Sequence, residues 1–387
     1  MTALFSRRGF LGGGCALCAT LAGCQTSGES LGRLAPGGRP AAGGDVASLW
    51  ELSDREERRV RQSRHIVRTP EVNAYISGLV ERLAGAYAKD VRVYVVRTPE
   101  VNATMYPNGM MHVWSGMLLR CADEAQLAAI LGHELGHYLE QHSAANLRSL
   151  RAASDAALFV GMGLAVAAGP AAATLAQLSI IAGAFSFSRD QEREADAIGL
   201  DLIARTGYAP LAAAQLWERM MAERAAEDRD RPRTEDFFFA THPSSAERAQ
   251  TLTALAAGRS GEAHADRYRH SLGAFQVTMI EDELRMRRFR RSEWLFERLH
   301  TDGANPGLML FARAEVNRLR DFPGDQTRAA DFYTRALNEP GAPAEAWRGL
   351  GLIERKRDRQ ADASRAFRRY LDLKPDAGDA ALIRSYL

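Results

Sequence analysis

The sequence predicts an α+β chain, mostly α-helical, in which a domain with a small sheet is followed by a helical repeat domain. Three observations lead to this expectation. Two short segments alternate in polarity as strands do, many longer segments repeat apolar residues at helical spacing, and a helical pattern recurs near the carboxyl end. The 387 residues, 46% of them hydrophobic, are enough for two or more domains with real cores.

Residues 1–23 have the organisation of a lipoprotein signal peptide. A basic start and an apolar run rich in Gly and Ala lead to Leu21-Ala22-Gly23, which resembles the lipobox that precedes an acylated cysteine. We therefore expect cleavage before Cys24 and acylation of this residue, and Gln25 resembles the sorting residue of outer-membrane lipoproteins. Arg7-Arg8 also fits a twin-arginine signal, so the twin-arginine and general secretory routes both stay open.

Residues 24–48 are predicted to form a flexible tether, because Gly, Pro and Ala are abundant there. The next domain is expected over residues 49–257, and it opens with an amphipathic helical pattern from Leu49 to Leu83. Two strands are predicted, one from the alternating Val91, Val93 and Val95 and one over Met110 to Trp114. We expect the free edge of the second strand, just before the next helix, to pair with an extended peptide.

The helix-patterned segment from Ala122 to Gln141 contains His133-Glu134-Leu135-Gly136-His137. Residues i and i+4 share one face of a helix, so both histidines can bind one Zn²⁺ while Glu134, one step round, reaches the water in the fourth position. Structural zinc sites prefer closed shells rich in thiolates, whereas two histidines and one carboxylate leave a position open. The sequence therefore predicts one catalytic zinc ion per chain, at a hydrolase centre.

Two carboxylates compete for the third ligand position, Glu192 and Glu194. The helix face of Glu192 carries small and apolar residues that can pack against the first helix, whereas Glu194 lies on a face that is typical of a solvated side. We therefore assign Glu192 as the ligand. Asp196, four residues further on, can accept the free ring N–H of His133 or of His137, which would fix the tautomer of that ring.

These motifs together resemble the M48 family of metallopeptidases, over about residues 50 to 257. The segments that carry the resemblance are Val101-Asn102-Ala103, Pro107-Asn108-Gly109, His133 to His137, Ser188 to Asp196, and Thr241-His242-Pro243 through Arg248. The resemblance implies a zincin-type metalloprotease domain in which His133, His137 and Glu192 bind zinc and Glu134 is the general base. Met105 and Tyr106 depart from the commonest form of the family, so the sequence does not predict the specificity pocket.

The resemblance also implies catalytic roles for His242 and Arg248. From its neighbours alone, a histidine before a proline in a polar loop is more often a turn element. Within the family pattern, His242 can bind the metal as a reversible fourth ligand in a resting state, or act as a donor to the reaction intermediate. The sequence leaves both roles open. Arg248 matches the arginine that accompanies this histidine, and either residue can stabilise the oxyanion.

The segment from Ala156 to Phe185 carries no charge. Gly169-Pro170 divides it into arms of about 14 and 15 residues, each short of the roughly 20 residues that a membrane-spanning helix needs. We therefore expect a helical hairpin packed on the peptidase domain. Because the segment lies between the two parts of the zinc site, a wall or lid of the cleft and a contact with lipid are alternatives to plain packing.

Residues 258–387 form arginine-rich helical pairs with a tetratricopeptide-like pattern. The matching positions are Trp347, Leu350, Gly351, Ala363, Phe367 and Pro375. Ala329 and Tyr333 precede Ala363 and Phe367 by 34 residues, which indicates an earlier copy. Such pairs stack into a concave surface that can bind partner segments. A helical domain with no partner is the alternative.

The formal net charge of +2 does not favour a polyanionic partner, so no nucleic-acid binding is expected. We predict a zinc metalloendopeptidase that is held by a lipid anchor and faces the periplasm, at the outer membrane. The resemblance implies that it hydrolyses misfolded or stalled envelope proteins, and that its repeats bind substrate or the outer-membrane protein assembly machinery. The alternative is a non-proteolytic chaperone or scaffold lipoprotein with an occluded zinc site.

Overall fold

The computed structural model describes residues 31–33, 35–40, 44–149, 185–226, 237–242, 246–273 and 275–387. The predicted signal peptide, Cys24 and most of the uncharged segment from Ala156 lie outside these residues. Among the helices that the structure describes, none combines the length and the apolar character needed to cross a membrane.

A three-stranded sheet lies in the first half of the chain, with strands β1 (Arg92–Val96), β2 (Ala103–Met105) and β3 (Met110–Trp114). The strand order is β1-β3-β2, with β1 parallel and β2 antiparallel to β3. The two predicted strands are confirmed as β1 and β3, while β2 was missed because three residues are too few to show an alternating pattern. The expectation that the second predicted strand has a free edge is wrong, because β3 is central and the outer edge belongs to β2.

Helices surround this sheet. They are α2 (Asp45–Gln62), α3 (Pro70–Ala84), the short 3₁₀ helix η1 (Gly85–Tyr87), α4 (Ser115–Arg120), α5 (Glu124–Leu139), α8 (Arg189–Arg205), α9 (Leu211–Ala225), α10 (Phe237–Thr241) and α11 (Ala246–Ala256). The helical pattern from Leu49 to Leu83 is divided into α2 and α3, because Ile66 pairs with Val96 and Pro70 starts a new helix. The α+β class, mostly helical, is confirmed.

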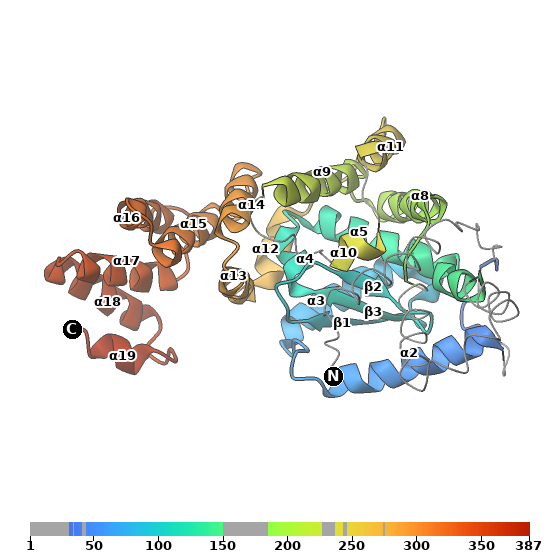
Figure 1. Ribbon diagram of the computed structural model, residues 1–387, viewed down its shortest axis with the longest axis horizontal. Coiled ribbons are helices and arrows are strands. Elements are labelled where there is room, and N and C mark those ends of the chain that lie inside the picture. Colours follow the sequence, from blue (N-terminus) through green and yellow to red (C-terminus); the bar gives the residue numbers. More distant parts are fainter. Residues whose placement is uncertain are drawn as a thin grey trace, which may run out of the picture.

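Helix α5 is the buried centre of this region, and all of its residues are buried. It packs against β2 on one side and against α8 and α9 on the other (Figure 1). Asp123 caps its first turn by accepting a hydrogen bond from the backbone N–H of Gln126. The Ser188 side chain and Gln191 form a capping box at the start of α8.

Glycines allow α5 and α8 to touch along their backbones. A Cβ atom at Gly199 would lie 2.7 Å from the backbone nitrogen of His133, and one at Gly136 would lie 2.8 Å from the carbonyl oxygen of Ala195. Both distances are shorter than a Cβ can tolerate, so any side chain here would push the two helices apart. This contact brings the acids of α8 to the histidines of α5.

We expect Gly199→Ala to destabilise the fold by about 1–3 kcal/mol, because the added methyl group overpacks the contact between the helices. It should also weaken metal binding, since the helices carry donor groups on both sides of the contact. Gly78→Ala in α3 is a matched control, because a Cβ there meets nothing within 4 Å and should stabilise the helix by about 0.5–1 kcal/mol. Denaturant unfolding of both variants is the measurement, and a stable Gly199→Ala protein with unchanged zinc affinity would contradict this account.

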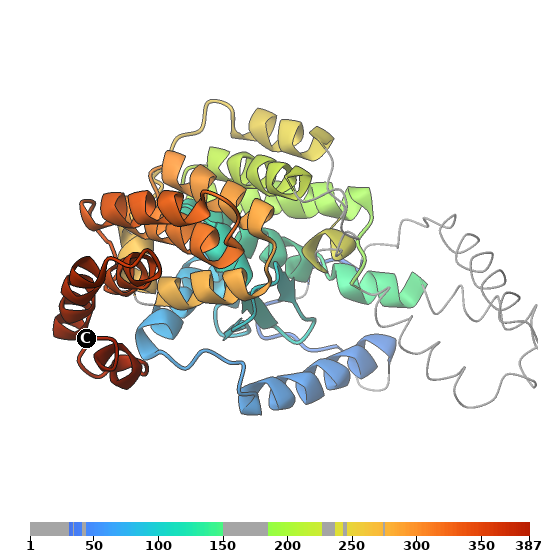
Figure 2. The same cartoon turned by 60° about the vertical axis from the view of Figure 1, so that its left-hand side comes forward.

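The carboxyl half contains helices and no strand over its described residues, which confirms the predicted helical region, while its boundaries as a separate domain stay a prediction (Figure 2). Its helices are α12 (Ala265–Leu272), α13 (Phe275–Arg285), α14 (Phe289–Thr301), α15 (Pro306–Arg320), α16 (Asp325–Leu337), α17 (Glu345–Lys356), α18 (Gln360–Leu373) and α19 (Ala380–Arg384). α15 packs against α16, and α17 against α18. Gly349 and Gly351 let the rings of Tyr333 and Phe367 approach closely. Assignment of these pairs as tetratricopeptide repeats stays a prediction.

A buried ion network joins the two halves. Arg120 of α4 lies with its Nη2 atom 2.6 Å from Glu223 Oε1 of α9 and 3.1 Å from Glu283 Oε2 of α13. Arg291 of α14 lies 2.7 Å from the same Glu223 oxygen. All four side chains are at most 2% exposed. Burial opposes the charge of Glu223, yet Arg120 and Arg291 hold its pKa below its ordinary value.

Candidate metal centre

Four buried side chains bring potential metal donors together: His133, His137, Glu192 and His242. The first two lie on α5, Glu192 lies in the first turn of α8, and His242 directly follows α10. One donor atom from each lies within 4.8 Å of all the others. The sequence-predicted ligands thus meet at one point, and His242 joins them.

The spacing of these donors suits a single metal ion. The Nε2 atoms of His133 and His137 are 3.1 Å apart, and His242 Nδ1 is 3.3 Å from His133 Nε2. Glu192 Oε1 is 2.9 Å from His242 Nδ1 and 3.4 Å from His137 Nε2. A tetrahedral zinc ion with ligands at about 2.0–2.1 Å has donors about 3.3 Å apart. The group therefore fits one zinc ion, and its histidine and carboxylate donors are those that zinc prefers.

Glu192 remains an anion in this site. Burial opposes its charge, but the rings of His242, His137 and His133 hold its pKa well below its usual range. Its competitor Glu194 lies outside the donor group, with its side chain 53% exposed. The structure thus brings the residue chosen from helical periodicity to the histidines, and leaves the other at the surface.

Glu134 lies beside the donors without belonging to them. Its Oε2 atom accepts a hydrogen bond from the backbone N–H of Met105 in β2, at 3.0 Å. Its Oε1 atom is buried, makes no hydrogen bond within the described part of the chain, and lies 3.4 Å from His242 Nε2. Burial raises the pKa of Glu134 above its ordinary value. A buried carboxylate with one unbonded oxygen is suited to accept a proton at this position.

Asp196 and Arg248 position His133, the first of the two histidine ligands on α5. Asp196 Oδ1 lies 2.9 Å from His133 Nδ1, which selects His133 from the two histidines that the sequence left open. Arg248 donates to both oxygens of Asp196, at 2.6 Å and 2.7 Å, and forms an ion pair with Glu192. Its guanidinium also lies 4.0 Å from the ring centre of Trp217. This geometry suits positioning of the two acids, whereas the sequence suggested a contact with the oxyanion.

Sequence reasoning missed two residues that contact His137. The ring of Phe187 stacks on it, with ring centres 3.7 Å apart and an angle of 23° between the planes. His142 Nδ1 lies 2.8 Å from His137 Nδ1, and His142 Nε2 lies 3.1 Å from Glu194 Oε2. Burial lowers the pKa of His142, which favours a neutral ring. The available signal was a third histidine just beyond the helix that carries His133 and His137, and a phenylalanine just before the Ser188 cap.

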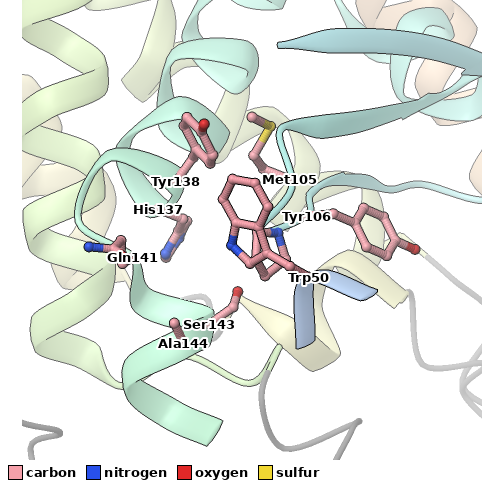
Figure 3. Close-up of a pocket in the computed structure, with 9 residues that line it drawn as sticks. Trp50, Met105, Tyr106, His137, Tyr138, Gln141, Ser143 and Ala144 are labelled. Carbon is pink, nitrogen blue, oxygen red and sulfur yellow. The ribbon is translucent and has the colours of Figure 1, made fainter. Parts of the chain in front are cut away.

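An apolar pocket opens beside the donor group (Figure 3). Trp50 of α2 covers it, with His137 and Tyr138 on one side and Met105 and Tyr106 on the other. Desolvation in this pocket raises the pKa of Tyr106 to about 12. The two residues that depart from the expected family pattern therefore line the pocket next to the metal site.

Comparison with known proteins agrees with this geometry. Residues 66–256 match the model of peptidase family M48. The chain is 33% identical over 181 residues to the mitochondrial metalloendopeptidase OMA1 of Schizosaccharomyces pombe, covering 46% of this chain and 51% of that protein. It is 28% identical over 176 residues to the putative beta-barrel assembly-enhancing protease of Vibrio cholerae, covering 43% of this chain and 36% of that protein.

The metalloprotease YcaL of Escherichia coli is 31% identical over 145 residues, which cover 38% of this chain and 54% of that protein. The chain thus spans about a third to a half of the length of these relatives. The matched region contains every donor of the metal centre, together with Glu134, Asp196 and Arg248. The chain therefore carries, in residues 66–256, a peptidase domain of family M48, as the motifs of its sequence predicted.

Proposed function

We propose that this protein is a zinc metalloendopeptidase that hydrolyses peptide bonds in unfolded polypeptides. The single observation that carries the proposal is the buried group of His133, His137, Glu192 and His242 with the unbonded oxygen of Glu134 beside it. A structural zinc site has no need of a buried carboxylate next to its ligands, whereas a hydrolase needs a base there.

In this proposal, His133, His137 and Glu192 hold the zinc ion. When bound, zinc acts as a Lewis acid and lowers the pKa of a water molecule at its open position. Glu134 accepts the proton of the attacking water on Oε1 and transfers it to the leaving amine. Asp196 and Arg248 keep His133 and Glu192 in place. The backbone N–H of Met105 keeps the Glu134 carboxylate oriented toward the donors.

The outer edge of β2 is suited to receive the substrate backbone. Asn102 and Tyr106 exchange hydrogen bonds with β3, through Trp114 N–H and Met110 O. By the alternation of antiparallel strands, Ala103 and Met105 then direct their backbone groups toward the outer edge, where the Met105 N–H already donates to Glu134. An extended peptide can pair with the outward groups of this edge, and the narrow apolar pocket beside Trp50 lies next to it. Both features favour unfolded chains as substrates.

The test of the proposed activity is cleavage of an unfolded polypeptide such as casein by the zinc-loaded protein. Cleavage should stop with 1,10-phenanthroline and return with zinc. Substrates in the cell can be captured with Glu134→Gln, which keeps the binding site, and identified by mass spectrometry. A zinc-loaded protein that leaves unfolded chains intact both in its unaltered form and as His242→Ala would contradict the proposal.

We further propose that His242 holds the enzyme in a latent state. Its Nδ1 atom completes the donor group, so a bond from it to zinc would take the position that the catalytic water needs. The α10 segment, which carries His242, also contacts the chain at the start of the β2 edge, since the Phe238 N–H donates to the Val101 carbonyl oxygen at 3.3 Å. Activity then requires this segment to move away.

His242→Ala should therefore raise the basal cleavage of an unfolded substrate, with zinc retained by the other three ligands. The measurement is the initial rate of cleavage at saturating zinc, compared with the unaltered protein. A fall in kcat would indicate that the same ring also stabilises the reaction intermediate, which is the other role the sequence left open. Unchanged kinetics would exclude both roles.

The lipid anchor remains a proposal from the sequence, because Cys24 lies outside the described residues. We expect Cys24→Ala to block acylation and lipoprotein processing, so that the protein no longer fractionates with membranes. Radiolabelled palmitate on the Cys24→Ala protein would contradict this. The beta-barrel assembly-enhancing proteases among the relatives support a periplasmic location at the outer membrane and a partner in outer-membrane protein assembly. We propose that this partner contacts α15–α18.

A second candidate is a non-proteolytic scaffold or chaperone with an occluded zinc site. The observation that favours it is the complete donor group, in which His242 stands where a catalytic site would keep an open position. The two candidates differ in cells. If the chain acts as a scaffold, Glu134→Gln restores every function of a deletion strain, whereas an essential peptidase activity is lost in that variant.

A further inference from the structure

His142 lies at the back of the metal centre, away from the donor side of His137. Its side chain is buried, and both of its ring nitrogens face a polar atom: Nδ1 lies 2.8 Å from His137 Nδ1, and Nε2 lies 3.1 Å from Glu194 Oε2. His137 directs its other nitrogen, Nε2, toward His133 and Glu192. The three side chains therefore form a line from the solvent-exposed carboxylate of Glu194 to the donor group.

When His137 is a metal ligand, the donor and the acceptor of each hydrogen bond in this line are fixed. A metal-binding Nε2 must be unprotonated, so the neutral ring of His137 carries its hydrogen on Nδ1 and donates it. His142 Nδ1 must then be the acceptor, which leaves the hydrogen of a neutral His142 on Nε2. Glu194 can only accept when ionised, so it receives that hydrogen. Every donor in the line then meets an acceptor.

We propose that His142 is a positioning residue for the metal centre, which accepts the Nδ1–H of His137, donates to Glu194 and thereby fixes the tautomer and orientation of the His137 ring. This inference rests on the metal site of the proposed function. His133 receives the same support directly from Asp196. For His137, the carboxylate of Glu194 acts through the ring of His142. The hydrogen bond that His137 donates from Nδ1 raises the basicity of its ligand nitrogen, Nε2.

The local backbone is built for this contact. Gln141 has a φ of 53°, a left-handed conformation that ends the α5 direction directly after the zinc histidines. A new helical turn starts at His142. The change of chain direction brings the His142 ring to Nδ1 of His137. On a continuous helix, a residue five positions after His137 would lie on a different face. Phe187 covers one face of the His137 ring, while His142 meets its Nδ1 edge.

The experiment compares His142→Asn with His142→Gln by zinc affinity, measured by competition with a chromophoric chelator. The side-chain oxygen of asparagine lies about where Nδ1 of histidine lies, so this variant can still accept from His137. The amide of glutamine reaches about to the Nε2 position and leaves His137 without its acceptor. We expect His142→Asn to bind zinc within a few-fold of the unaltered protein, and His142→Gln and His142→Leu to lose about 10- to 100-fold in affinity.

The visible absorption spectrum of the Co²⁺-substituted protein is the second readout, and it should change in the glutamine and leucine variants. His112→Phe is the matched control, a buried histidine in β3 whose ring contacts Tyr94 and Tyr106, and it should leave zinc affinity unchanged. Equal affinities in all three His142 variants and the unaltered protein would overturn the role of His142. Failure of the unaltered protein to bind zinc would instead overturn the metal site itself.

Discussion

Glu134→Gln is expected to bind about one equivalent of zinc and to lose peptidase activity by about 10²- to 10⁴-fold, the usual contribution of a general base. The amide keeps the shape of the side chain but cannot take a proton at Oε1. It makes no difference to the four donors, because Glu134 is not one of them. The measurements are the zinc content after dialysis and kcat/KM on an unfolded substrate.

Two neighbouring acids provide the comparison. Glu192→Gln should lose most of both zinc and activity, since the side chain is a donor and also the anion that faces Arg248. Glu194→Gln should keep both to within a few-fold, because its side chain is half-exposed and an amide oxygen can still accept from His142. If Glu194→Gln lost the metal and Glu192→Gln kept it, the assignment of the third ligand would be wrong.

Glu223→Ala is expected to destabilise the fold by about 3–5 kcal/mol, the usual cost of removing one partner from a buried ion pair. The change leaves Arg120 with Glu283 as its ion-pair partner and removes the acceptor that Arg291 shares with it. These residues connect α4, α9, α13 and α14, so both halves of the chain should lose structure together. Denaturant unfolding measures the effect, with the circular dichroism signal of the helices and the zinc affinity as the two readouts.

Asp331→Ala is the surface control. Asp331 and its ion-pair partner Arg335 in α16 are both exposed, so the pair should contribute little to the free energy of unfolding. A second comparison separates charge from packing. Glu223→Gln keeps the volume and one acceptor, so it should be less destabilising than Glu223→Ala but still costly. A Glu223→Ala protein as stable as the Asp331→Ala protein would show that the buried network does not hold the halves together.

Local patterns predicted the centre of the site, and long-range packing produced the rest. His133, Glu134 and His137 lie within one helix, so helical periodicity alone places them together. Glu192 followed from a similar argument about one face of α8. His142 was missed because its contact depends on the left-handed conformation of Gln141, which the sequence does not reveal.

The errors in the fold have similar causes. The three residues of β2 were too few to show a pattern. The helical pattern expected from Leu49 to Leu83 is interrupted by a bridge between Ile66 and Val96 that only the assembled sheet provides. Arg120 and Glu223 are 103 residues apart, and nothing in either neighbourhood shows that they pair. Buried ion pairs of this kind follow from the final arrangement of helices.

The hydrogen bond between Phe238 and Val101, together with the placement of His242, makes the α10 segment a competitor built into the chain. A tethered competitor acts at an effective concentration that is typically in the millimolar range. A short peptide free in solution, at micromolar concentration and with similar contacts, would lose this competition. A long unfolded chain that is also held by the carboxyl-terminal helices would acquire an effective concentration of its own. Selection of substrates would then depend on attachment at two points, with little demand on the sequence around the cleaved bond.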